Sequence, residues 1–288
     1  MPVVVVTDSS ASLEPELVER YGIRVVPLHV LAGDEDLREG IDPVPADLTG
    51  VTTSGASQNE LSEAYAEALD SSGGAGVLAV HISRQLSATW EAGRQAAQKF
   101  GGNVRIIDSQ STGMGLGYPV LEAARAAKGG AALETVYRRA VDVASRGHCL
   151  IVVDKLDQLR RGGRIGTAAA LLGTALAMKP VLHLVDGRLV LKEKTRTGTK
   201  AVAKMVDAAV EYAGQGRTAI AVHHMDARRR ADAVAAQLKD RIPQISDIVV
   251  TDFSAVIGAH VGVGAVGIVL CPEPSVQDEE GDSSTTPD

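Results

Sequence analysis

The sequence predicts an α/β protein folded as two domains, and two observations support this class. Short β-branched runs alternate with helix-like segments through the first half, which is typical of a parallel sheet covered by helices on both faces. The chain has 288 residues, more than most small single domains contain. We therefore expect an N-terminal parallel-sheet domain over residues 1–147, a C-terminal α/β domain over residues 148–272 and a disordered acidic tail over residues 273–288.

The first half divides into strands and helices in a regular order. We expect strands at residues 3–6, 23–31, 76–82 and 104–108, and helices at residues 15–21, 58–70, 88–100 and 118–128. Ser57 and Glu60 form an S-x-x-E capping box in front of the second of these helices, and apolar residues behind them recur at helical spacing. Residues 33–56 are acidic and contain prolines, so we expect a loop there.

The second half is less regular. We expect helices at residues 136–147, 199–213 and 227–241, and strands at residues 149–156, 218–224, 247–253 and 265–271. The segment 157–179 predicts a basic turn that leads into an apolar helix. Two apolar runs joined by Asp186 and Gly187 predict a β-hairpin over residues 181–195, because this pair suits a type I′ turn.

Composition excludes several classes of function. Aromatic residues make up 3% of the chain and the net charge is −7, so we expect no nucleic-acid partner.

The N-terminus lacks the charged start of a signal peptide. The apolar stretch 255–271 predicts a loop and a buried strand, because it contains His260 and several glycines. Cys149 and Cys271 lie in apolar runs, where buried thiols are expected. We expect a cytoplasmic protein without a metal site or stable membrane insertion.

Loops rich in hydroxyl groups follow three predicted strands and precede one predicted helix. They cover residues 7–12, 51–57, 83–89 and 109–115. Ligands of open α/β sheets bind at the carboxyl ends of the strands, and the helix N-termini there suit an anion. Serine and threonine are also ordinary N-cap residues, so any single loop could serve capping alone. Four such loops, with Arg84 as their one basic residue, favour a polar site for a singly charged group rather than a triphosphate.

Two further features leave alternatives open. His260 lies between Gly258 and Gly262, where it could be structural, could bond an anion, or could complete a hydrolase triad with a serine and an aspartate. The segments 159–166 and 191–200 concentrate arginine and lysine in an otherwise acidic chain. Solvated helix ends account for most clusters of this kind, but the pair also resembles a docking or phosphate-handling surface.

Seven motifs in this order resemble the DegV family, also known as the fatty-acid-binding subunits of bacterial fatty acid kinase. They are VVVVTDSSASL, TTSGAS, SRQLSATW, IIDSQSTGMGLG, LDQLRRGGRIG, KPVLHLVDGRLVLKEKTRT and GAHVGVGA. The resemblance extends to about residue 271. It departs from the family pattern at Gly55-Ala56, Ala88 and Val263, where the family has Gln-Pro, Gly and Pro; these changes bear on pocket shape and chain-length preference.

The resemblance implies a fold of two α/β domains with a fatty acid buried between them. It implies that Thr53 and Ser87 hydrogen-bond the fatty-acid carboxylate with His260 nearby, and Ser54 and Ser109 are further candidates for that role. Ser87 is also expected to be the N-cap of its helix. A separate kinase subunit phosphorylates the bound carboxylate in the family, and Arg164 and Arg196 match arginines that would meet it.

This reading makes the protein a carrier of a long-chain fatty acid, with no catalytic residues and no cofactor besides that ligand. The alternative is a stand-alone hydrolase or phosphotransferase that uses Ser87 or Ser109 with His260. A carrier should copurify with fatty acid, whereas an enzyme should turn over an ester or phosphate substrate alone.

Overall fold

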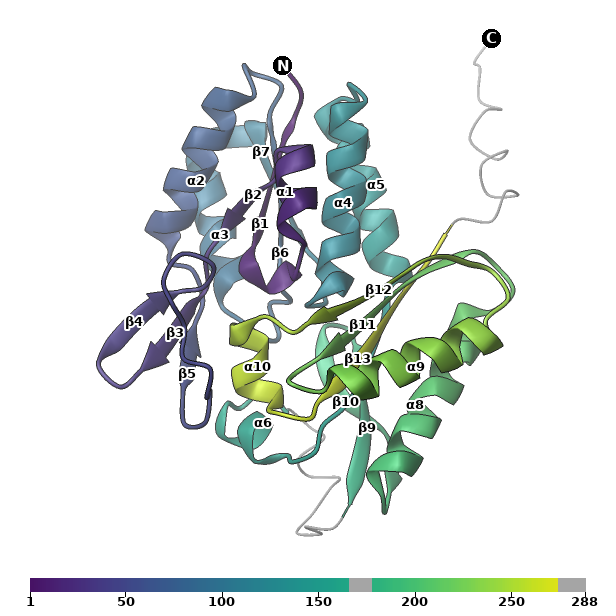
Figure 1. The fold of residues 1–288 in the computed structure, drawn as a ribbon. Coiled ribbons are helices and arrows are strands. Elements are labelled where there is room, and N and C mark those ends of the chain that lie inside the picture. Colours follow the sequence, from purple (N-terminus) through teal and green to yellow (C-terminus); the bar gives the residue numbers. More distant parts are fainter. Residues whose placement is uncertain (166–177, 274–288) are drawn as a thin grey trace.

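Two large β-sheets and one small sheet organise the chain (Figure 1). The computed structural model describes residues 1–165 and 178–273. The apolar helix expected within residues 157–179 and the tail expected over residues 273–288 lie almost entirely outside the described residues. In the described ranges, no helix is both long and apolar enough to cross a membrane.

The first sheet is entirely parallel, as the alternation of strands and helices predicted. Its strands in spatial order are β2 (Arg24–Val26), β1 (Val4–Asp8), β6 (Val77–His81) and β7 (Val104–Asp108). Helices α1 (Pro15–Tyr21), α4 (Met114–Lys128) and α5 (Leu133–Arg146) cover one face, and α2 (Gln58–Ser71) and α3 (Thr89–Ala97) cover the other. Short 3-10 turns follow β1 (Ser9–Ala11) and α3 (Gln98–Asn103).

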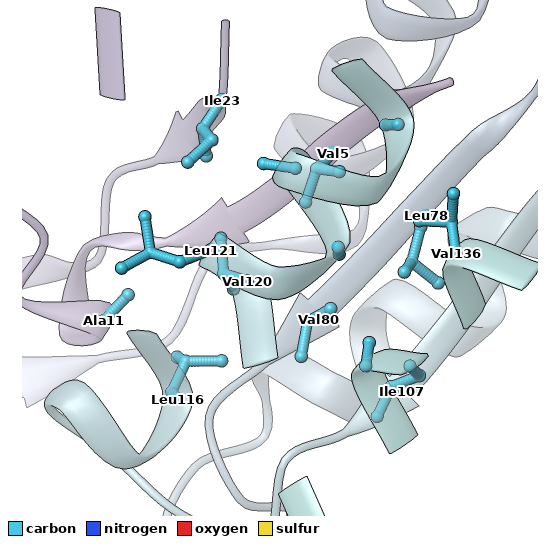
Figure 2. Packing of buried hydrophobic residues seen from close by; sticks show 14 of the residues in the cluster. Val5, Ala11, Ile23, Leu78, Val80, Ile107, Leu116, Val120, Leu121 and Val136 are labelled. Atoms are coloured by element: carbon cyan, nitrogen blue, oxygen red, sulfur yellow. The ribbon is translucent and has the colours of Figure 1, made fainter. Parts of the chain in front are cut away.

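Alternating side chains of the parallel strands fill two separate cores. Figure 2 shows Val80 of β6 near Val120 of α4 and Leu78 of β6 beside Val136 of α5, and all four side chains are fully buried. Ala79, which lies between Leu78 and Val80 in sequence, belongs to the core on the opposite face. Every residue of β6 is buried, which is typical of parallel strands with helices on both faces. Each fully buried aliphatic side chain of this kind contributes roughly 1.5–3 kcal/mol.

The second large sheet has six strands and is mostly antiparallel. In spatial order they are β10 (Arg188–Thr195), β9 (Lys179–Val185), β8 (His148–Val152), β13 (Val266–Pro272), β11 (Thr218–His224) and β12 (Ile245–Asp252). Helices α8 (Gly198–Ala213) and α9 (Arg228–Arg241) pack on one face. The β9–β10 hairpin was predicted, and the positive φ angles of Asp186 (49°) and Gly187 (78°) fit the expected type I′ turn.

A small antiparallel sheet was not predicted. Its strands in spatial order are β4 (Glu35–Arg38), β3 (His29–Ala32) and β5 (Thr52–Ser54). The expectation of one strand over residues 23–31 is wrong, because Pro27 has no N–H for a continuing ladder and the chain changes sheet between β2 and β3. The loop expected at residues 33–56 contains β4 and β5, whose short pairings to β3 leave little trace in the composition.

The segment before β13 also differs from the expectation. Residues expected to be a loop form α10 (Ala255–Val261), whose N-cap Ser254 accepts a hydrogen bond from the Ile257 amide at 3.5 Å. His260 therefore lies in the last turn of a helix, not on a glycine loop. Helix α6 (Asp157–Arg161) and the small sheet both contact α10, and Figure 1 shows α6 directly below it. Helix α4 begins at Met114, before the expected residue 118, because the Met114 amide donates to Nε2 of His223 at 3.0 Å and this contact caps the helix.

Candidate functional site

One cavity brings together five of the residues singled out in the sequence. Thr53 and Ser54 reach it from β5, Ser87 from the loop between β6 and α3, Arg164 from the segment after α6, and His260 from α10. The remaining lining is mostly aliphatic, including Leu28 and Ile257. The cavity therefore has polar groups at one end and apolar walls elsewhere.

The polar end is built around a hydrogen bond between Thr53 and His260. The Thr53 Oγ1 and His260 Nε2 atoms lie 2.7 Å apart, although the residues are 207 positions apart in the chain. Burial, and then the positive charge of Arg164, lower the pKa of His260 to about 4. The imidazole is therefore neutral at pH 7, where it has one donor and one acceptor nitrogen.

Ser87 lies beside this pair but is not the N-cap of its helix. Its Oγ atom is 2.9 Å from Oγ1 of Thr89 and accepts a hydrogen bond from the Thr89 amide at 3.3 Å. The helix is assigned with Ala88 as its N-cap, one residue later than expected, and the hydrogen bond that caps the Thr89 amide still comes from the Ser87 side chain. The reason is local: the Ser87 amide donates to the Ser83 carbonyl at 3.0 Å, and this turn delays the start of the helix.

A glycine allows β5 to approach the start of α3. A Cβ atom built on Gly55 would lie 2.6 Å from Oγ1 of Thr89 and 2.9 Å from Oγ of Ser87. A side chain at residue 55 would therefore require the Thr89 and Ser87 hydroxyls to shift. Gly55 lines the cavity together with Thr53 and Ser87, at the position where the DegV pattern has glutamine.

A second, almost wholly apolar cavity continues from the first. Both cavities share the lining residues Leu86, Thr112, Leu189, Ile257 and Val261. Beyond these, the second cavity is walled by the six-stranded sheet on the face opposite α8 and α9, with Ile151 and Phe253 among its side chains. A polar end joined to an apolar interior suits an amphipathic ligand.

Arg164 borders the polar end and holds the neighbouring loop. Its Nε atom donates to the Leu86 carbonyl at 3.0 Å, and its guanidinium also bonds the Gly162 carbonyl. A Cβ atom on Gly162 would lie 2.3 Å from Nδ1 of His260, so this glycine lets α6 pack against the imidazole. Arg164 thus lies within reach of the same site as His260.

Two of the predicted site residues lie elsewhere. Ser109 is 1% exposed, and its hydroxyl donates to the Ser111 carbonyl at 3.1 Å; it lines neither cavity. Arg196 is exposed just after β10 and also lines neither cavity. The Ser–His pair required by the hydrolase alternative is not formed by the described residues, since Nε2 of His260 bonds Thr53 and the Ser87 hydroxyl bonds Thr89.

The structure adds site residues that sequence reasoning missed. Thr112 lines both cavities, and its buried Oγ1 atom has no hydrogen-bond partner among the described residues. It belongs to the hydroxyl-rich loop 109–115, in which the sequence analysis named Ser109 as the candidate. Ser83 of the loop 83–89 donates to the Gly187 carbonyl at 2.9 Å and thereby ties that loop to the β9–β10 turn.

Nothing in the described part of the chain is arranged as a metal site. No group of three or more His, Cys, Asp or Glu side chains there could hold an ion. The cysteines Cys149 and Cys271 are both free thiols, and burial raises the pKa of each, to about 12 and about 11. The chemistry of the site is therefore carried by hydroxyls, a neutral imidazole and one guanidinium.

Several known proteins are similar to this chain along almost its whole length. A family model described as "Uncharacterised protein, DegV family" matches residues 2–273. A DegV domain-containing protein of Mycobacterium bovis is 48% identical over 272 residues, which cover 94% of this chain and 97% of that protein. A DegV domain-containing protein of Streptomyces coelicolor is 41% identical over 275 residues, covering 93% and 98%.

Solved structures with the same architecture include fatty-acid-binding proteins. A DegV family protein from Thermus thermophilus, described for its fatty acid binding, has a TM-score of 0.89 at 32% identity and covers 95% of this chain and 100% of that one. DegV from Bacillus subtilis, described as a fatty acid binding protein, has a TM-score of 0.83 at 30% identity with the same coverage. The whole-chain matches confirm the predicted α/β fold, and the chain belongs to the DegV family.

Proposed function

We propose that this protein binds a long-chain fatty acid, with the carboxylate at Thr53, Ser87 and His260 and the acyl chain in the adjoining apolar cavity. The observation that carries the proposal is the junction of these polar groups with an apolar cavity that shares five of its lining residues. The fatty-acid-binding relatives from Thermus thermophilus and Bacillus subtilis support the same ligand class.

The two parts of such a ligand would contribute to its affinity in different ways. Burial of an acyl chain gains about 0.8 kcal/mol per methylene, so the apolar cavity supplies most of the affinity. The carboxylate still requires hydrogen-bond donors, because an unpaired buried charge is very costly. Thr53 and Ser87 can donate to it while leaving it nucleophilic, whereas a tight Lys or Arg clamp would hold its charge more firmly and reduce its reactivity.

The second part of the proposal is that the protein presents this carboxylate to a separate ATP-dependent kinase, which converts it to an acyl phosphate. The chain itself supplies binding and orientation and acts without catalytic residues or a cofactor. Arg164, at the polar end, and Arg196, exposed after β10, are the residues we assign to the encounter with the kinase or the transferred phosphoryl group. The domains would be residues 1–147 and 148–272, since the six-stranded sheet begins at His148.

Native mass spectrometry of the purified protein, followed by lipid extraction, tests the ligand. We expect a bound mass equal to that of a long-chain fatty acid, and recovery of the complex when delipidated protein is reloaded. Absence of fatty acid both before and after reloading would falsify the carrier proposal. Turnover of an ester or phosphate substrate by the protein alone would favour the hydrolase alternative.

A further inference from the structure

A third cavity adjoins the hydrogen-bonded pair Thr53 and His260. This vestibule is lined by residues 50–53, Gln158, residues 161–162, Arg164 and residues 259–260. Thr53, Arg164 and His260 line both the vestibule and the polar end of the inner cavity. The vestibule has a volume of about 180 Å³, several times the roughly 30 Å³ that a water molecule takes up in the liquid. Thr53 and His260 therefore border two cavities, the inner cavity and the vestibule, and we call this pair the boundary.

The vestibule is positively charged in an acidic protein. Arg161 and Arg164 line it, and no aspartate or glutamate is among the described residues of its lining, although the whole chain has a net charge of −7. The Arg161 side chain is exposed, and among the described residues it has no hydrogen-bond or ion-pair partner. A cavity of this composition favours an anion, and a guanidinium fits a phosphate in a bidentate manner.

We propose that the vestibule binds the phosphoryl group of an acyl phosphate, with Arg161 as a phosphate-binding residue beside Arg164. The inference rests on the proposed function, which places the carboxylate on the inner side of the boundary. A carboxylate that takes over the hydrogen bonds of Thr53 and His260 has its second oxygen at that boundary. A group attached to this oxygen extends into the vestibule.

In the proposed reaction, a nucleoside triphosphate bound to the partner kinase donates the phosphoryl group. A carboxylate oxygen forms a bond to the γ-phosphorus, the bond from that phosphorus to the β,γ-bridging oxygen breaks, and the nucleoside diphosphate leaves. The ligand then carries a phosphate in place of a carboxylate, so its negative charge increases and moves outward. Arg161 therefore contributes more to binding of the product than to binding of the fatty acid.

A stable analogue of the acyl phosphate allows binding of the product to be compared with binding of the fatty acid. A 2-oxoalkylphosphonate retains the acyl chain and carbonyl group and replaces the labile bridging oxygen with a methylene. Titration calorimetry of delipidated protein would compare this analogue with a fatty acid of the same chain length. We expect Arg161→Gln to weaken the phosphonate by about tenfold or more, as for loss of a charge-assisted hydrogen bond, and to change fatty-acid affinity by less than about twofold.

Matched variants show whether the charge acts at this position. Arg160→Gln removes the same charge from the neighbouring residue, which does not line the vestibule, and is expected to preserve both affinities. Arg161→Lys is expected to restore part of the phosphonate affinity. In ³¹P NMR, the second pKa of the bound phosphonate should be lower in the wild type than in Arg161→Gln, because a nearby guanidinium favours the dianion.

The possible outcomes separate this inference from the proposed function. Equal weakening of both ligands by Arg161→Gln, or unchanged phosphonate binding, overturns the vestibule assignment while leaving fatty-acid binding intact. Failure of the wild type to bind the fatty acid at all overturns the proposed function itself. Equal loss of phosphonate affinity in Arg160→Gln would show a general charge effect and also contradict the assignment.

Discussion

Thr53 and Ser87 supply neutral hydroxyls where a charged clamp would be expected for a carboxylate. Thr53 is hydrogen-bonded to His260 and Ser87 to Thr89. Exchange of those partners for a carboxylate keeps every group hydrogen-bonded. Hydrogen bonds to a charged group are worth about 1.5–3 kcal/mol each, more than the bonds between neutral groups that they replace.

Removal of both hydroxyls should therefore weaken fatty-acid binding strongly. For Thr53→Ala combined with Ser87→Ala we expect a loss of about 100-fold or more in affinity, measured by displacement of a fluorescent fatty acid. Ser109→Ala is the matched control, because this serine lies in a similar loop but outside both cavities. Unchanged affinity in the double variant, with the fold retained by circular dichroism, would refute the head-group assignment.

Buried histidines should make the protein less stable in mild acid. Burial lowers the pKa of His223 and of His260 to about 4, whereas the pKa of histidine in an unfolded chain is about 6.5. Between these values the unfolded state binds more protons, so the free energy of unfolding falls as pH decreases from about 6.5 to about 4. Each histidine contributes a slope of up to about 1.4 kcal/mol per pH unit within that window.

Urea unfolding at pH 7, 6 and 5 measures this slope. His260→Gln should reduce this slope by up to about 1.4 kcal/mol per pH unit, because glutamine does not take up the proton that His260 binds on unfolding. A slope unaffected by this substitution would mean that His260 is protonated in the folded state at these pH values.

Helix α10 depends on a contact from the small sheet rather than on its own length. It has seven residues, and isolated helices this short are unstable in water. Oε1 of Glu39, just beyond β4, accepts a hydrogen bond from the Val256 amide at 2.9 Å in the first turn of α10. Thr53 holds the other end of the helix through His260. The small sheet thus positions the helix that carries the imidazole.

Substitution of Glu39 should consequently affect the site from a distance. Glu39→Ala removes the acceptor, and we expect a loss of about 1–3 kcal/mol in unfolding free energy together with weaker fatty-acid binding. Glu39→Gln keeps an acceptor oxygen and replaces a carboxyl whose pKa is raised by burial with a neutral amide, so it should retain most of both properties. The comparison uses urea unfolding and ligand titration, and equal behaviour of the two variants would contradict the capping role.

At the scale of the whole molecule, the apolar cavity joins residues from distant parts of the chain. Leu86 and Thr112 come from loops of the parallel sheet, whereas Leu189 and Phe253 come from the six-stranded sheet and its connections. The loop 83–89 is also fixed to the β9–β10 turn by the bond from Ser83 to Gly187. A ligand that fills this cavity binds both parts and binds only the folded state.

Fatty acid should therefore stabilise the whole fold. Free ligand at 100 times its Kd is expected to raise the unfolding free energy by about 2.7 kcal/mol, through binding to the folded state alone. Thermal unfolding of delipidated protein with and without ligand measures the increase in Tm. The combined Thr53→Ala and Ser87→Ala variant should give a smaller increase at the same ligand concentration; an equal one would place the stabilising contacts elsewhere.

The sequence by itself determined the features that depend on local interactions. The capping box at Ser57 and Glu60 starts α2 as predicted, and Asp186-Gly187 forms the hairpin turn. Periodicity and β-branched runs also identified the parallel sheet. Thr53, Ser87 and His260 were selected by motif resemblance, and their residue types alone would not have separated them from ordinary caps and loop residues.

Only the tertiary structure decided which of these residues meet. The three short strands of the small sheet and the seven residues of α10 have weak local signals, because their stability comes from pairing and packing. Their placement brings Thr53 to His260 across 207 positions, and it leaves Ser109 outside the cavity although its sequence context is similar. Contacts between elements so distant in the chain depend on the packing of the entire molecule, which no local pattern records.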